Sequence, residues 1–261
     1  MNTMRVNNDG GSIAVEVHGD GPLVLCVPGM GESRSSFRHL CLAESGFRVA
    51  ILDLRGHGDS SVDFEDYDDP ATARDILAVI SHLGGPATVI GNSMGAAAAV
   101  IAATEYPDAV NGLVLIGPFV RDHGPAAALR FALMKPWGPI VWTMYHRKLF
   151  GDITPDDHAE HLTLTRQLLK RPGRWRAFER TARTSHAPAE AALPKVNVPT
   201  LVIMGDKDPD FRDPEAEAIW VAGNTRGRHT MIPGARHYPM AEQPEAVSSV
   251  ITPFLKEITN G

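Results

Sequence analysis

The chain has 261 residues, of which 43% are hydrophobic and 21% are charged, and its formal net charge is −6 at pH 7. This length suits one large α/β domain or a domain with an inserted subdomain, and the apolar content excludes a disordered chain. Because the charge is negative and no block of lysine and arginine occurs, we expect no nucleic-acid partner.

The cysteine content and the apolar runs of the sequence indicate the cellular compartment. The two cysteines, Cys26 and Cys41, are too few for a disulfide framework, and both are predicted to be small buried hydrophobes. Residues 1–5 lack the apolar core of a signal peptide, and no apolar run reaches membrane-spanning length. We therefore expect a soluble, cytoplasmic protein without a membrane partner. The sequence leaves the oligomeric state open between a monomer and a homodimer.

Short apolar strands alternate with helical segments along the chain, which is the pattern of a mostly parallel sheet with helices on both faces. The predicted strands cover residues 13–17, 23–27, 49–52, 88–90, 113–116, 201–204 and 229–232. The predicted helices between them cover residues 36–44, 71–82, 94–105, 214–221 and 244–257. The sequence therefore predicts an α/β fold.

The alternation breaks between Pro118 and Pro199, where the sequence is rich in Trp, Met, Arg and His and contains no convincing strand. We predict a core domain made of residues 1–117 and 199–261, and a helical insertion at 118–198. The insertion would leave the sheet at the carboxyl ends of the strands, where ligands bind in open α/β sheets. It is therefore placed to roof a pocket.

The most informative segment is GNSMG at residues 91–95. It follows a predicted β-branched strand and precedes an alanine-rich helix. A serine on a tight strand-to-helix turn projects its hydroxyl above the sheet, and the flanking glycines permit such a turn. Ser93 is therefore the predicted nucleophile.

A serine hydroxyl is a weak nucleophile unless a base takes its proton, and the base needs an orienting acid. On a turn of this kind the partners follow in the order Ser, Asp or Glu, His, each on a loop after a strand. The loop after the strand at 201–204 carries Asp208, the preferred acid. Asp206 in the same loop and Asp122, after the strand at 113–116, are the alternatives.

The predicted base is His237, in a loop bounded by glycine and proline directly after the last predicted strand. The chain contains 11 histidines, so the position in the chain singles out His237. His57 is the competing residue, but it follows an earlier strand, and we interpret its segment as a structural turn.

An oxyanion formed during acyl transfer needs two preorganised donors. The N–H of Met94 lies at a helix start, directly after Ser93. Met30 lies between two glycines in the loop after the strand at 23–27, so Met30 and Met94 are the predicted oxyanion donors. This loop matches neither the Walker nor the dinucleotide-binding pattern. We therefore expect no cofactor, and no metal site is predicted.

Several segments match the motifs of one superfamily. They are VPGMG at 27–31, DLRGHGDS at 53–60, GNSMG at 91–95, GDKD at 205–208, and His237 followed by Pro239 and by EQPE at 242–245. With these motifs the chain resembles the α/β-hydrolase superfamily over essentially its full length. The resemblance implies an eight-stranded, mostly parallel sheet with helices on both faces, a helical cap at 118–198, and the roles given above for the site residues. One departure is Pro28, where many members carry histidine; proline can set that turn by fixing φ.

The elbow also looks like that of the meta-cleavage-product hydrolases, which split C–C bonds in vinylogous 1,5-diketones. Those enzymes usually carry tryptophan after the catalytic histidine, whereas this chain has Tyr238. Ser93 at the elbow argues against haloalkane dehalogenase or epoxide hydrolase chemistry, because those similar enzymes use aspartate there.

Three functions remain in competition. The first is a cofactor-independent serine hydrolase that cleaves a small, apolar carboxylic ester or lactone through an acyl-enzyme on Ser93. The second is a C–C hydrolase, in which Arg121, Arg130 or Arg147 would hold a carboxylate. The third is a non-catalytic ligand-binding protein on the same scaffold.

Overall fold

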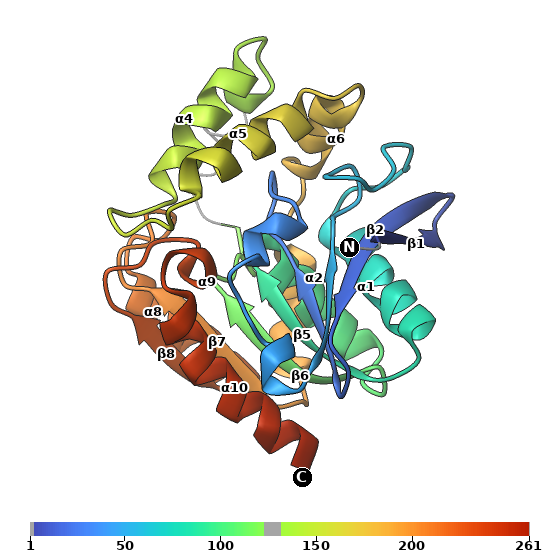
Figure 1. The fold of residues 1–261 in the computed structure, drawn as a ribbon, viewed down its shortest axis with the longest axis vertical. Helices are drawn as coiled ribbons and strands as arrows, with labels where there is room; N and C mark the ends of the chain where they lie inside the picture. The colour runs from blue at the N-terminus through green and yellow to red at the C-terminus, as the bar shows by residue number, and fades with distance from the viewer. Residues whose placement is uncertain (1–2, 123–131, 261) are drawn as a thin grey trace.

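The computed structural model describes residues 3–122 and 132–260 (Figure 1). Its centre is an eight-stranded sheet with the strand order β1-β2-β4-β3-β5-β6-β7-β8. Strand β2 pairs antiparallel with β1 and β4, and all other neighbours are parallel. The strands are β1 (Thr3–Asn8), β2 (Gly11–His18), β3 (Leu23–Val27), β4 (Arg48–Leu52), β5 (Ala87–Asn92), β6 (Val110–Ile116), β7 (Thr200–Gly205) and β8 (Arg228–Ile232).

The predicted α/β class and mostly parallel sheet are confirmed. All seven predicted strands occur, as β2 to β8, with ends that differ by a few residues. Strand β1 was not predicted, because it is a polar edge strand in which Val6 is the one buried residue. An edge strand with one covered side chain has too weak an apolar pattern to be recognised in the sequence.

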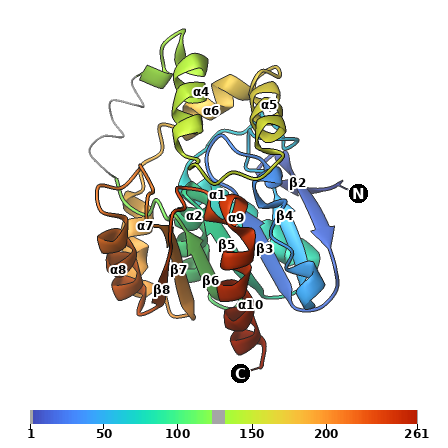
Figure 2. The ribbon, with the colours of Figure 1, turned by 60° about the vertical axis from the view of Figure 1, so that its left-hand side comes forward.

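Helices cover both faces of the sheet (Figure 2). The helices on these faces include α1 (Asp69–Leu83), α2 (Met94–Glu105), α8 (Pro214–Thr225) and α10 (Pro244–Asn260), and three more, α4 (Gly138–Lys148), α5 (His158–Leu169) and α6 (Arg174–Thr181), lie in the segment between β6 and β7. Leu25 and Val27 of β3 face the layer of α1, α2 and α8, whereas Val24 and Cys26 face the layer of α10. Because both faces are covered, successive side chains of this central strand are all apolar.

The predicted helix at 36–44 is wrong. Two short 3-10 turns, η1 (Arg34–Phe37) and η2 (Ala43–Ser45), lie there instead. Phe37, Leu40 and Leu42 are all buried, but their spacing does not follow one face of an α-helix, so an irregular path is needed to bury them together. Cys26 is buried as predicted, whereas Cys41 is exposed, because it lies on this irregular path.

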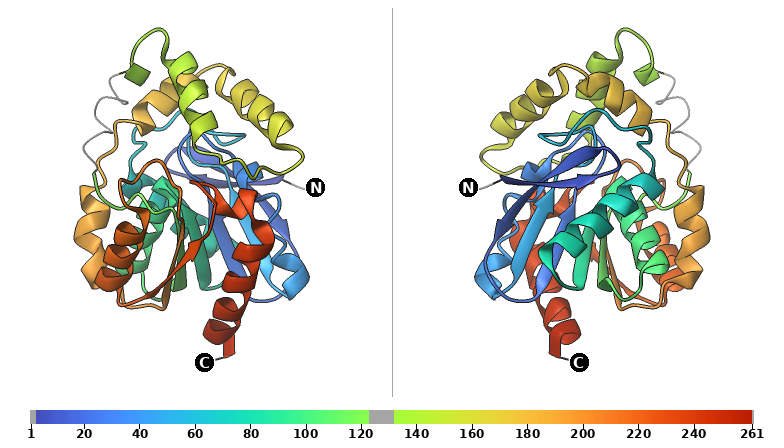
Figure 3. Two further views of the ribbon diagram at one scale, coloured as in Figure 1. Left: turned by 90° about the vertical axis from the view of Figure 1, so that its left-hand side faces the viewer. Right: turned by 90° about the vertical axis from the view of Figure 1, so that its right-hand side faces the viewer.

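Helices α4, α5 and α6 stand above the sheet, over the ends of the strands (Figure 3). They belong to the segment predicted as a helical cap at 118–198. The short helix α7 (Ala187–Ala192) follows them and packs against the core instead, where Ala189 and Ala192 join the same apolar cluster as α2. The division of the chain into two domains stays a prediction.

No helix in residues 3–122 and 132–260 is both long and apolar enough to cross a membrane.

A buried ion pair fixes the segment that follows β4. The guanidinium of Arg55 donates from Nε to Asp75 Oδ2 at 2.7 Å and from Nη2 to Asp75 Oδ1 at 2.8 Å. The side chains of Arg55 and Asp75 are only 2% and 1% exposed. Arg55 also donates to the carbonyl oxygen of Asp66 and lies 4.6 Å from the ring centre of Phe64. This pair ties the segment after β4 to helix α1.

Candidate active site

Ser93 lies on the turn between β5 and α2, with φ 55° and ψ −121°. Positive φ is uncommon for a residue with a side chain, and such strain persists where the surroundings fix it. A Cβ atom on Gly91 would lie 2.6 Å from backbone atoms of Ala96, and one on Gly95 would lie 2.4 Å from the carbonyl oxygen of Val27. Both glycines are therefore required for α2 to begin so close to β5 and β3.

The predicted acid and base lie together. His237 Nδ1 and Asp208 Oδ2 are 2.7 Å apart, and both side chains are almost fully buried. Burial by itself would lower the pKa of His237, but the carboxylates of Asp208 and Asp210 outweigh this effect and raise the pKa to about 9. Asp208 therefore orients the ring and favours its protonated form.

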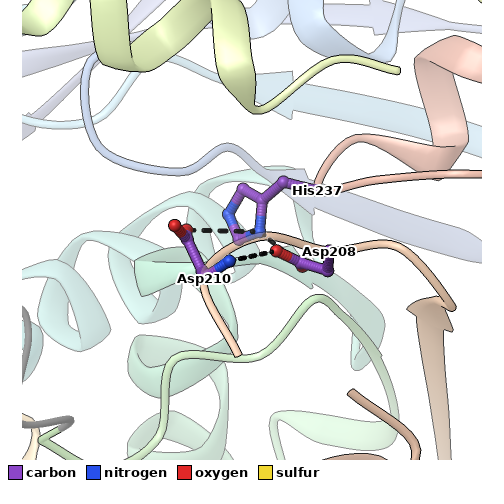
Figure 4. Close-up of side chains that lie close together, drawn as sticks. All are labelled: Asp208, Asp210 and His237. Atoms are coloured by element: carbon purple, nitrogen blue, oxygen red, sulfur yellow. Dashed lines mark hydrogen bonds and ion pairs between the residues drawn. The ribbon is translucent and has the colours of Figure 1, made fainter. Parts of the chain in front are cut away.

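Asp210 is a second carboxylate beside the same ring nitrogen (Figure 4). Its Oδ2 lies 3.6 Å from His237 Nδ1, and its backbone N–H donates to Asp208 Oδ1 at 3.0 Å. The hydroxyl of Tyr145, on α4, donates to Asp210 Oδ1. Burial and the charge of Asp208 raise the pKa of Asp210, while the charge of His237 and the Tyr145 hydrogen bond lower it, and the net shift is upward. Asp210 thus connects helix α4 to the acid–base pair.

Asp208, Asp210 and His237 can also offer one ligand atom each to a metal ion. The His237 atom that faces the carboxylates is Nδ1, which already donates to Asp208. A metal ion bound there would replace that hydrogen bond, so metal binding and acid–base orientation are competing uses of this cluster.

Asp210→Asn is expected to shift the pH dependence of activity. His237 must be neutral to accept a proton, so kcat/KM rises with pH as the ring loses its proton. Without the negative charge of Asp210 the pKa of His237 falls, and the midpoint of that rise should move down by about 1 pH unit. Steady-state kinetics from pH 5 to 10 with one activated ester measures the shift.

The matched control is Asp206→Asn, which removes a carboxylate from the same loop. Asp206 accepts a hydrogen bond from the N–H of Gly234 at 2.7 Å, away from the acid–base pair. The control should leave the midpoint unchanged. An unshifted midpoint in Asp210→Asn would mean that Asp210 does not act on the charge of His237.

The alternative acids and the competing base lie elsewhere. Asp206 bonds to Gly234, as described above, and Asp122 accepts a hydrogen bond from the Ser185 hydroxyl at 2.7 Å. His57 donates from Nδ1 to the carbonyl oxygen of Arg55 at 3.0 Å, and burial lowers its pKa to about 4. A fully buried, neutral imidazole of this kind supports a turn.

The loop after β3 lies against the elbow. A Cβ atom on Gly29 would lie 2.9 Å from Ser93 Cβ, so the backbone of this loop passes directly beside the serine. Met30 and Met94 both line the cavity above Ser93. Within the described residues, neither backbone N–H takes part in a loop, turn or cap hydrogen bond. Both are therefore available to an oxyanion.

One cavity of about 340 Å³ joins these groups. Ser93 and His237 both line it, together with apolar and aromatic side chains of α4 and of the loops around the elbow, among them Phe119, Trp142 and Phe211. The Ser93 hydroxyl and His237 Nε2 have no hydrogen-bond partner among the residues that the structure describes. In enzymes without bound substrate, the hydrogen bond between a nucleophile and its base is often long, and it shortens only when substrate binds.

A buried cluster fastens the helices above the sheet to the loop beside Ser93. Glu32 follows that loop and lies 2.5 Å from His146 Nε2 on α4 and 3.1 Å from His161 Nε2 on α5. Burial would raise the pKa of Glu32, but the charges of His161 and His146 hold it well below its usual range. A Cβ atom on Gly31 would overlap the ring of Trp142 on α4, at 2.2 Å.

Sequence reasoning missed part of this site. Asp210 could have been recognised in the sequence, because it continues the alternating aspartates at 206, 208 and 210. Glu32 follows the predicted oxyanion loop directly. Tyr145 and His146 could not have been recognised, because a single sequence does not tell how an inserted helix packs over the sheet.

Of the arginines expected to hold a carboxylate, Arg121 and Arg147 do not line the cavity. Arg121 donates from Nε to Glu217 Oε1 at 3.1 Å and lies 3.8 Å from the ring centre of Trp220. Arg147 is exposed on α4. Arg130 lies outside the described residues. Within residues 3–122 and 132–260, the arginine that lines the cavity is Arg212, on the loop that carries Asp208 and Asp210.

The eight-stranded sheet, the strained serine elbow and the His–Asp pair at the strand ends define the architecture of an α/β hydrolase. The chain belongs to the alpha/beta hydrolase family, whose family model matches residues 24–250.

Relatives of the chain include hydrolases with different reactions. The chain is 26% identical to human epoxide hydrolase 4 over 91% of this chain and 73% of that protein. It is 25% identical to 2-hydroxy-6-oxo-6-phenylhexa-2,4-dienoate hydrolase of Comamonas testosteroni, over 95% and 88% of the two chains. A thermophilic esterase from Thermogutta terrifontis, solved with malate bound, is 28% identical over 99% of both chains with a TM-score of 0.81. These relatives support a hydrolase activity and leave its substrate class open.

Proposed function

We propose that the protein is a cofactor-independent serine hydrolase that cleaves a small, mainly apolar carboxylic ester or lactone. The observation that carries this proposal is that Ser93, on its strained elbow, and His237 line one cavity, and that His237 is hydrogen-bonded to the buried Asp208 behind it. These are the nucleophile, base and acid of acyl transfer, in the chain order that this fold uses.

The reaction proceeds in two halves. Ser93 Oγ attacks the acyl carbon while His237 Nε2 takes its proton, and the N–H groups of Met30 and Met94 hold the oxyanion. His237 then gives the proton to the leaving alcohol. In the second half a water, deprotonated by His237, attacks the acyl-enzyme; the bond to Ser93 Oγ breaks, His237 returns the proton to that oxygen, and the acid is released, while Asp208 stabilises the imidazolium in both halves.

The esterase of Thermogutta terrifontis supports an ester substrate, because its likeness to this chain extends over the whole of both molecules. The apolar and aromatic lining of the cavity suits an apolar acyl or alcohol group, and its volume of about 340 Å³ suits a small one.

A burst assay tests the proposal. With 4-nitrophenyl butyrate in excess, we expect either a rapid initial release of nitrophenol equal in amount to the enzyme or steady turnover of the ester. We also expect a fluorophosphonate to label Ser93 covalently. No turnover of any ester, thioester or lactone would overturn the proposal. Absence of labelling would favour a non-catalytic ligand-binding protein.

A C–C hydrolase is the second candidate, favoured by the relative from Comamonas testosteroni. Tyr238, where that class usually carries tryptophan, stacks on Phe150 with ring centres 4.6 Å apart. The test is the absorbance of a yellow ring-fission dienoate, which falls as the C–C bond breaks. Unchanged absorbance under conditions in which an ester is cleaved would reject this candidate.

A further inference from the structure

A second histidine–aspartate pair includes His186, which lines the same cavity. His186 Nδ1 is 2.7 Å from Oδ2 of Asp69, the first residue of α1, and the Asp69 side chain is fully buried. The other carboxylate oxygen, Asp69 Oδ1, is buried without a partner among the described residues. His186 is therefore the described side chain that compensates the buried carboxylate of Asp69, and Asp69 in turn fixes the orientation of the His186 ring.

The histidines of the two pairs both lie next to one aromatic ring. The ring centre of Phe119 is 5.7 Å from that of His186 and 6.2 Å from that of His237. His186 and His237 both line the cavity, together with Phe119. Among the described residues His186 is hydrogen-bonded to Asp69 and not to Ser93, and the proposed reaction leaves it unused.

The free nitrogen of His186 is available to a ligand. Nδ1 is held by Asp69, and Nε2 has no hydrogen-bond partner among the described residues and is not among their fully enclosed polar atoms. Because His186 lines the cavity and Nδ1 is taken by Asp69, Nε2 is the ring nitrogen left for a bound molecule. The Asp69 carboxylate balances the positive charge of the ring when Nε2 donates to an anion.

A second cationic side chain lines the cavity, and the carboxylate that also lines it, Asp210, already accepts from Tyr145 and lies beside His237. Arg212 lines the cavity and forms no salt bridge within the described residues. Asp122 also lies near His186, but it accepts from the Ser185 hydroxyl and, at 3.4 Å, from the backbone N–H of His186, on the backbone side of that residue. A planar carboxylate is the small anion that imidazolium and guanidinium donors both recognise.

We propose that His186, positioned by Asp69, binds a terminal carboxylate of the substrate, so that the hydrolase selects acyl groups carrying a second acid group. This rests on the proposed function and deepens it: the acyl carbon lies at Ser93, an apolar chain passes Phe119, and the carboxylate lies at His186. The preferred substrates are half esters of short dicarboxylic acids.

Matched pairs of phenyl esters test the proposal. The half esters of succinate, glutarate and adipate are compared with phenyl butyrate, pentanoate and hexanoate, which end in a methyl group at equal length. The wild-type enzyme should prefer the half ester in at least one pair. His186→Leu should lower that preference about tenfold or more, mainly by raising KM for the half ester. The kcat/KM for the methyl-ended ester should change less than about twofold.

Two further variants separate recognition from packing. His186→Gln keeps a donor at this position and should retain part of the preference, whereas Asp69→Asn should lose most of it because the ring loses the carboxylate that orients it. Equal losses on both esters in His186→Leu would overturn the proposal, and so would a wild-type enzyme that disfavours every half ester.

A binding measurement keeps this result separate from failure of the proposed function. Calorimetry with Ser93→Ala compares the affinity for phenyl adipate and phenyl hexanoate, with and without His186→Leu. A carboxylate-dependent affinity that disappears in His186→Leu supports the site even when no ester is turned over. Affinity that is indifferent to the carboxylate overturns it, whereas turnover of phenyl hexanoate by the wild-type enzyme tests the esterase activity alone.

Discussion

Ser93→Ala is expected to lower kcat for an activated ester by about 10⁶-fold, because the acyl-enzyme can no longer form. Asp208→Asn should cost about 10⁴-fold, since the His237 ring loses the partner that fixes its tautomer and stabilises its charge. The three residues act as a unit, so Ser93→Ala combined with His237→Ala should be no slower than Ser93→Ala alone. Stopped-flow and steady-state release of nitrophenol measure these rates.

Ser36→Ala is the matched control for this series. Ser36 is a buried serine on η1, and its hydroxyl has no hydrogen-bond partner among the described residues. Its replacement should leave kcat and fluorophosphonate labelling unchanged. If Ser93→Ala kept more than about 1% of the activity, the nucleophile would have to be another group.

Asp75→Ala should lower the free energy of unfolding by about 3–5 kcal/mol. The substitution leaves the guanidinium of Arg55 buried without the carboxylate that accepts two of its hydrogen bonds. This is a large share of the 5–15 kcal/mol that typically stabilises a domain. Urea unfolding followed by circular dichroism gives the difference.

Glu257→Ala is the comparison for this prediction. Glu257 pairs with Arg228, but the two side chains are 58% and 59% exposed, so its loss should cost less than about 1 kcal/mol. The double change Arg55→Met with Asp75→Leu should restore part of the stability, because it removes both buried charges. Equal effects of Asp75→Ala and Glu257→Ala would show that the buried pair contributes no more than a surface pair.

The sequence was sufficient for the sheet because its inner strands are covered on both faces. Val24 and Cys26 face one helix layer and Leu25 and Val27 the other, so the run is apolar throughout and easily recognised. The same reasoning fails for β1, which buries little. It also fails at residues 36–44, where burial of irregularly spaced side chains overrides helix periodicity.

The site was predictable where it depends on the sheet. Ser93, Asp208 and His237 each follow a strand, and neighbouring parallel strands bring their ends to one edge. Tyr145 and His186 could not be predicted, because they come from the segment between β6 and β7, which reaches the site through tertiary packing. Their contacts with Asp210 and Asp69 depend on how that segment docks.

The buried attachment of α4 and α5 to residues 30–32 limits how freely the upper helices can be exchanged. Trp142 fills the space beside Gly31. His146 and His161 both contact Glu32, which lies two residues after Met30 in the chain. A chimera that receives these helices from a relative would place new side chains against the loop beside Ser93. Replacing α4 and α5 to change the substrate range would therefore also require replacing residues 30–32. Without that second replacement, the reaction rate would change along with the selectivity.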